Sequence, residues 1–158
     1  MTTERQPLWH PLSLIATWLG SGRLPWAPGT WGSLAALPFA WVIHGMAGPV
    51  GLGLAAVLTF VVGWPVSARY ARQMGQQDPG EIVIDEVAGQ WLTLVVAPRD
   101  PVIYAIGFVL FRIFDIFKPW PISFVERKLS GGLSIMLDDV IAGVLAAAVL
   151  AVGLRLIG

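Results

Sequence analysis

Long apolar stretches, separated by short turns rich in glycine and proline, dominate this chain. The five stretches run from Trp31 to Met46, Val50 to Ala68, Ile82 to Ala97, Val102 to Phe117, and Val140 to Ile157. None of them alternates apolar and polar residues strictly, as a half-buried strand does. The pattern therefore predicts an all-α protein.

The lengths of these stretches set the expected architecture. A helix needs about 20 apolar residues to cross the hydrocarbon core of a bilayer. The first, third and fourth stretches are shorter, so they either span with local thinning or are buried helices that stop part-way. A further segment, Leu8 to Leu19, suits a helix that lies in the membrane interface or one that packs on the bundle. We expect a compact membrane-embedded helical bundle of about five hydrophobic helices plus this N-terminal helix, forming one domain over residues 1–158.

The composition favours a surface that faces lipid. Of 158 residues, 56% are hydrophobic and only 13% are charged, and the mean hydropathy is +0.71; soluble domains carry about 25% charged residues. The formal charge of zero argues against a nucleic-acid partner, which needs a basic face. The absence of cysteine excludes disulfides, thiolate nucleophiles and cysteine-ligated metals.

Charged residues gather at one end of the predicted bundle. If the N-terminus is cytoplasmic and all five stretches cross, eight basic residues lie on the cytoplasmic side and only Arg99 and Arg155 on the other, as the positive-inside rule expects. From Asp78 onward, eight carboxylates also lie on the cytoplasmic side, and only Asp100 lies opposite. Acidic residues do little to set topology, so this clustering indicates one charged site at the cytoplasmic helix ends.

Three acidic groups are candidates for metal binding. Asp85 and Glu86 interrupt an apolar run, Asp115 lies near the end of the next stretch, and Asp138 and Asp139 open the last one. Carboxylate oxygens are the ligands that Mg²⁺ prefers. Two simpler interpretations stay open: solvated carboxylates at a helix N-terminus for the first pair, and an N-cap for Asp138.

Two other groups of residues suit a phosphate. Arg112, Asp115 and Lys118 recur every three residues, which places them on adjoining parts of one helix face; an arginine fork and a lysine charge can hold phosphate oxygens against a metal. The alternative is a plain ion pair between Arg112 and Asp115, with Lys118 reaching the interface. Thr30 and Ser33 lie at the start of the first stretch and could donate to an anion, although Thr30 also suits an ordinary N-cap.

Together and in this order, the motifs resemble the phosphatidylglycerophosphatase A family. The resemblance rests on Pro28-Gly29-Thr30 with Gly32-Ser33, Ile84-Asp85-Glu86 with Gly89, Phe111-Arg112 with Asp115, Lys118-Pro119-Trp120-Pro121, and Gly131-Gly132 with Asp138-Asp139. It implies a compact all-helical, Mg²⁺-dependent lipid phosphatase of the bacterial inner membrane. Such an enzyme removes the terminal phosphate of phosphatidylglycerophosphate to give phosphatidylglycerol and inorganic phosphate.

The residues themselves lead to compatible chemistry. Cysteine catalysis is excluded, the two histidines are not usefully placed, and no Asp-x-Asp-x-Thr motif offers an aspartyl-phosphate route. A water activated by a carboxylate-held metal remains, with a covalent aspartate as the alternative. The expected metal ligands are Asp85, Glu86, Asp115, Asp138 and Asp139.

The expected catalytic residues are Asp85, Glu86, Asp115 and Asp139, with Glu86 chosen as the base. The expected phosphate-binding residues are Arg112, Lys118, Thr30 and Ser33. A competing hypothesis is a small ion or proton transporter that uses the clustered acids. Transport would place charges near the membrane midplane and on both sides, whereas these acids crowd one end.

Overall fold

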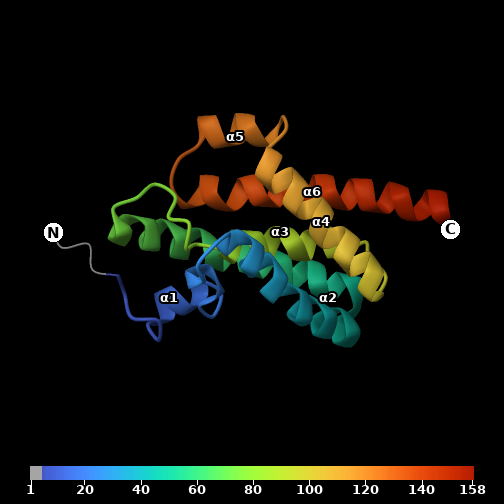
Figure 1. The fold of residues 1–158 in the computed structure, drawn as a ribbon, viewed down its shortest axis with the longest axis horizontal. Helices are drawn as coiled ribbons and strands as arrows, with labels where there is room; N and C mark the ends of the chain where they lie inside the picture. The colour runs from blue at the N-terminus through green and yellow to red at the C-terminus, as the bar shows by residue number, and fades with distance from the viewer. Residues whose placement is uncertain (1–4) are drawn as a thin grey trace.

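The computed structural model describes residues 5–158, and every regular element in that part of the chain is helical. The helices are α1 (Pro11–Ala16), α2 (Pro28–Met74), α3 (Ile84–Leu94), α4 (Pro101–Phe117), α5 (Ile122–Lys128) and α6 (Gly132–Ile157), with a 3₁₀ turn, η1, at Ser21–Arg23. Figure 1 shows α3 in the middle of the bundle, with α2 and α6 running along it. The prediction of an all-α bundle is confirmed.

Helix α2 consists of two limbs that fold back on each other and correspond to the first two predicted stretches. Gly48, with φ 67° and ψ −170°, breaks the helical geometry just before Pro49. A Cβ placed on Gly80, beyond the end of α2, would lie 4.0 Å from the ring of Pro28 at its start. A straight helix of 47 residues would be about 70 Å long, so the limbs must be antiparallel. Figure 1 shows the chain running out and returning.

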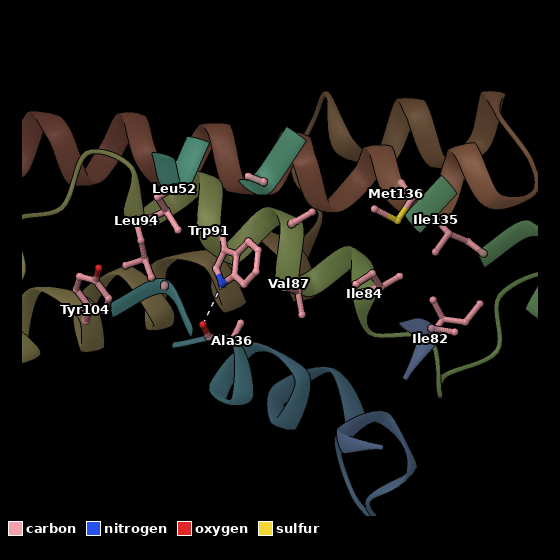
Figure 2. Close-up of a cluster of buried hydrophobic side chains, with 14 of the residues drawn as sticks. Ala36, Leu52, Ile82, Ile84, Val87, Trp91, Leu94, Tyr104, Ile135 and Met136 are labelled. Carbon is pink, nitrogen blue, oxygen red and sulfur yellow. Dashed lines mark hydrogen bonds between the residues drawn. The ribbon is translucent and has the colours of Figure 1, made fainter. Parts of the chain in front are cut away.

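Helix α3 forms the buried centre of the molecule. Nine of its 11 residues are buried, and Figure 2 shows Trp91 donating its indole N–H to the carbonyl oxygen of Ala36, 2.9 Å away. Eleven residues rise about 17 Å, little more than half the thickness of the hydrocarbon core. The third stretch is therefore a buried helix that stops part-way, one of the two alternatives that its length predicts.

The outer faces of the bundle are apolar. Helix α4 exposes Val102, Ile106, Val109, Ile113 and Ile116, whose spacing of three or four residues makes a continuous stripe along the helix. Helices α2 and α6 are long and apolar enough to cross a membrane, and only a small part of each apolar window is buried inside the bundle. Exposed apolar area on this scale marks an interaction surface and identifies a membrane-associated bundle.

Helix α1 is shorter than the predicted N-terminal helix and packs on the bundle. Ser13 and Ala16 are buried, and the carbonyl oxygen of Ala16 accepts a hydrogen bond from the backbone N–H of Val83 at 2.9 Å. Trp9, just before α1, is 79% exposed. Helix α1 therefore packs on the bundle, as the second of the two predicted alternatives has it, while Trp9 before it faces outward.

Candidate active site

The starts of α2, α3 and α6 and the end of α4 surround a polar cavity of about 290 Å³. All seven charged residues predicted for the site line it: Asp85, Glu86, Arg112, Asp115, Lys118, Asp138 and Asp139. Gly29, Gly80 and Asp78 also form part of the wall. The fold thus brings together charges from α3, α4, α6 and two adjoining loops at one end of the bundle, while α2 contributes an uncharged part of the wall.

Asp85, Glu86 and Asp139 converge within this cavity. One carboxylate oxygen from each lies within 4.8 Å of the others, and Asp85 and Asp139 are only 8% and 3% exposed. Each of the three has one buried oxygen without a hydrogen-bond partner among the described residues. Buried carboxylates this close repel one another, and unpaired buried charge is costly. The donor set therefore fits a hard divalent cation such as Mg²⁺.

A crossing of two glycines explains why these acids meet. A Cβ on Gly143 of α6 would lie 3.0 Å from the Cα of Gly89 in α3 and would also collide with the Gly89 carbonyl. The two backbones therefore touch at this point. Asp85 precedes Gly89 by four residues and Asp139 precedes Gly143 by four residues, which is about one helical turn. Because both helices start at the same end of the bundle, close approach at the glycines places the two carboxylates side by side.

The remaining predicted metal ligands, Asp115 and Asp138, each bind a cationic side chain. Arg112 forms an ion pair with Asp115, and its Nη1 also lies 4.0 Å from Oε1 of Glu86. Lys118 Nζ lies 2.8 Å from Oδ2 of Asp138 and 2.8 Å from Oε1 of Glu126. The plain ion pair considered for Arg112 does form, but inside the charged cavity.

Lys118 keeps its charge in this environment. Burial lowers the pKa of its ammonium group, but hydrogen bonds to Asp138 and Glu126 and their negative charges outweigh burial and raise that pKa above its ordinary value. The side chain is therefore a fixed positive charge on the cavity wall at neutral pH.

Thr30 and Ser33 lie outside the lining of this cavity. Thr30 is inside the first turn of α2, whose N-cap is Ala27, so the N-cap interpretation of Thr30 is wrong. Ser33 is fully buried; its hydroxyl donates to the Gly29 carbonyl at 2.9 Å and accepts from Nη1 of Arg112 at 3.5 Å. The Ser33 hydroxyl therefore contacts Arg112, which itself lines the cavity.

Gly29, a member of the predicted motif at the start of the first stretch, forms part of the wall of the site. A Cβ at this position would lie 3.2 Å from both terminal nitrogens of Arg112 and would collide with Oε1 of Glu86. The missing side chain leaves room for these two groups to approach each other. The motif Pro28-Gly29-Thr30 contained this signal, but only the helix packing shows which residues it accommodates.

A second polar network supports the segment between α2 and α3. Tyr70 donates its hydroxyl to Oε2 of Glu81 at 2.7 Å, Arg23 Nε lies 3.4 Å from the same oxygen, and Arg5 pairs with Oε1. Burial raises the pKa of Glu81, but the hydrogen bonds from Arg5 and Tyr70 and the charges of Arg5 and Arg23 outweigh it and hold that pKa below its ordinary value of 4.5. The network anchors the chain just before Asp85.

An apolar helical bundle that carries clustered carboxylates, an arginine and a lysine at one end is suited to act on phosphate esters at a membrane. The family model described as Phosphatidylglycerophosphatase A matches residues 14–154. The chain belongs to the phosphatidylglycerophosphatase A family and is a phosphoric monoester hydrolase. The family resemblance predicted from the motifs is thereby confirmed.

Similarity to individual proteins extends over most of the chain. Phosphatidylglycerophosphatase A of Escherichia coli is 42% identical over 148 residues, covering 93% of this chain and 86% of that protein. The protein of the same name from Haemophilus influenzae is 37% identical, covering 91% and 92%. A Bacteroides thetaiotaomicron relative with the provisional name phosphatidylinositol-3-phosphatase is 35% identical, covering 98% and 99%. No solved structure matches the chain.

Proposed function

We propose that this protein hydrolyses the terminal phosphate of phosphatidylglycerophosphate in a Mg²⁺-dependent reaction that gives phosphatidylglycerol and inorganic phosphate. The observation that carries the proposal is the convergence of two buried carboxylates and one half-buried carboxylate, all incompletely hydrogen-bonded, in a cavity that Arg112 and Lys118 also line. The names of the Escherichia coli and Haemophilus influenzae relatives support this choice of substrate.

Asp85, Glu86 and Asp139 would hold the metal, because their oxygens converge and lack other partners. When bound there, Mg²⁺ would offset charge on the phosphoryl oxygens and acidify a coordinated water. Asp115 and Asp138 would serve mainly by orienting Arg112 and Lys118, which they contact.

Arg112 and Lys118 would hold the phosphate. The guanidinium group offers two parallel N–H donors to phosphate oxygens, and the ammonium group offers a point charge. Glu86 is the proposed base: its Oε1 lies 4.0 Å from Arg112, so a water that attacks a phosphate held by Arg112 would lie within its reach. The water oxygen would bond to phosphorus while its proton passes to the carboxylate, and the phosphorus–oxygen bond to the leaving group would break. The leaving oxygen would take a proton from solvent water and depart as the alcohol.

We further propose a multi-pass location in the bacterial inner membrane, with the site facing the cytoplasm. Arg99 supports this topology, because it lies beside Gly45 and over the ring of Trp41, 4.7 Å from its centroid, at the turn between the two limbs of α2. That turn is remote from the charged cavity. A site at the cytoplasmic helix ends would take a lipid headgroup while the acyl chains stay in the bilayer. The same one-sided position disfavours a transport pathway, which needs charges along the membrane depth.

The test is phosphate release from phosphatidylglycerophosphate by purified protein in detergent. We expect release with Mg²⁺, none with EDTA, and recovery when Mg²⁺ is restored in excess. No release with Mg²⁺ from correctly folded protein would contradict the proposed substrate. Release that is insensitive to EDTA would contradict the metal-dependent mechanism while leaving the phosphatase activity intact.

A further inference from the structure

We propose that a second cavity, beside the phosphate site, binds the headgroup glycerol of the leaving alcohol and thereby selects a hydroxylated alcohol over an apolar one. This inference rests on the proposed function. The cavity measures about 160 Å³, far above the 10–15 Å³ or so that a single water needs. Its polar lining residues are Gln77, Asp78, Glu126, Ser130, Ser134 and Asp138.

The two cavities share part of their walls. Asp78 and Asp138 line both. Lys118 lines the phosphate site, and its ammonium group binds Asp138 and Glu126, two acids of the second cavity. A phosphate ester held by Lys118 therefore has its bridging oxygen close to the boundary between the cavities, and the alcohol beyond that oxygen would lie in the second one.

The lining chemistry points to a neutral polyol. No basic residue lines the second cavity, so its three carboxylates would repel an anion. Glu126 and Asp138 share the single positive charge of Lys118, which weakens their attraction for a free cation. An acyl chain would cover the carboxylates and serine hydroxyls without hydrogen-bonding them, at a cost in free energy. Alcohol hydroxyls can donate to the carboxylates and accept from Ser134, while Leu129 and Ile135 contact carbon atoms.

This assignment predicts how the enzyme distinguishes phosphomonoester lipids. In phosphatidylglycerophosphate, the carbons next to the scissile phosphate belong to a glycerol with a free hydroxyl group. In phosphatidic acid they belong to diacylglycerol, whose neighbouring oxygens are esterified. The second cavity can satisfy its polar groups only with the first substrate, and a site left with unpaired polar groups discriminates strongly.

The experiment uses two competitors of phosphatidylglycerophosphate hydrolysis. Inorganic phosphate fills only the first cavity, whereas glycerol 3-phosphate reaches both. We expect Ser134→Ala to raise the inhibition constant for glycerol 3-phosphate about 3–10-fold, the loss of one hydrogen bond, and to leave that for inorganic phosphate unchanged. Ser134→Thr keeps the hydroxyl and should restore the wild-type constant. Ser123→Ala, on α5 outside the lining, is the matched control.

Equal changes for both competitors, or no change for either, would overturn the glycerol assignment. Both results would leave the proposed function standing, because that function is tested by phosphate release from phosphatidylglycerophosphate by the wild-type protein. Failure of the proposed function has a different signature: wild-type protein would then release no phosphate from this lipid. If Ser134→Ala does not fold, unequal inhibition by the two competitors in the wild-type protein still tests the assignment, since a glycerol site requires tighter binding of glycerol 3-phosphate.

Discussion

Asp139 is a buried carboxylate whose charge is not fully compensated by hydrogen bonds. It is 3% exposed, and its Oδ2 lacks a hydrogen-bond partner among residues 5–158. A carboxylate in this position destabilises the protein unless a cation or proton compensates it. The position of Asp139 beside Asp85 and Glu86 supports the proposed metal site.

Replacement Asp139→Asn removes one charge from the cluster and keeps the shape. We expect phosphate release to fall by about 100-fold or more and Mg²⁺ to lose most of its effect on the melting temperature. Without metal, the variant should melt no lower than wild type, because repulsion among the three acids decreases. The measurements are phosphate release and thermal unfolding in detergent with and without Mg²⁺.

Asp100→Asn is the matched control for this change. Asp100 lies outside the lining of the charged cavity and caps the N-terminus of α4. Its carboxylate accepts hydrogen bonds from the N–H groups of Val102 and Ile103, and an asparagine side-chain oxygen can do the same. Near-wild-type activity and a normal Mg²⁺ response in Asp139→Asn would contradict the metal assignment.

Among the helices, the contact between α3 and α6 decides the geometry of the site. The Gly89 carbonyl lies against Gly143, and Thr93 Oγ1 donates to the carbonyl oxygens of both Gly89 and Gly143, at 3.0 and 3.3 Å. Small residues allow two helix backbones to approach closely. Asp85 and Asp139 lie one helical turn before Gly89 and Gly143, so the close contact of the two backbones brings their carboxylates together.

Gly143→Ala should therefore disturb the site from a distance. The added methyl group collides with the Gly89 backbone, so we expect a lower melting temperature and at least a 10-fold loss of phosphate release, since small misplacement of reacting groups is costly. Gly153→Ala on the same helix is the control: its Cβ meets nothing within 4 Å. It should be neutral or slightly stabilising. Similar behaviour of the two variants would exclude the glycine crossing as the positioning device.

Across the whole molecule, the Glu81 network ties the N-terminal segment to the segment that leads into α3. Arg23 contributes to this connection by donating to the Gln6 carbonyl at 2.7 Å and to Ser13 Oγ at 3.1 Å. Because the pKa of Glu81 is lowered in the folded protein, its ionised form stabilises the fold. That stabilisation is complete above the unfolded pKa and is lost as the pH falls through the folded pKa.

Glu81→Gln should consequently lower the melting temperature at pH 7 by several degrees, as expected for the loss of one or two charge-assisted hydrogen bonds. The difference between wild type and variant should shrink as the pH falls below about 4. Thermal unfolding in detergent between pH 7 and pH 3 measures it. A difference that stays constant over this range would show that ionised Glu81 contributes no net stability.

The absence of native cysteine allows a direct test of membrane topology. A single cysteine at Lys128, at the C-terminal end of α5, should react with a membrane-impermeant maleimide only after the cell membrane is opened. A cysteine at Met46, 84% exposed beside the turn in α2, should react in intact spheroplasts. The reverse pattern would place the active site on the outer side, and labelling of both in intact cells would exclude a transmembrane arrangement of these positions.

The helical class, the apolar outer surface and the charged residues that line the cavity were all predictable from local pattern. Apolar runs without alternation define helices, and charges inside such runs are costly enough to mark function. The short helix α5 escaped this reasoning because its sequence, Ile122–Lys128, mixes polar and apolar residues between two prolines and the following glycines.

The spatial selection among those charged residues depended on tertiary packing. Sequence spacing treats Asp115, Asp138 and Asp139 alike, but the folded chain pairs the first two with Arg112 and Lys118 and leaves Asp139 with Asp85 and Glu86. The fold also buries Ser33 in contact with Arg112. These outcomes follow from where helix backbones touch, at Gly29 and at the crossing of Gly89 with Gly143. Such contacts join residues far apart in the chain, so local pattern carries no information about them.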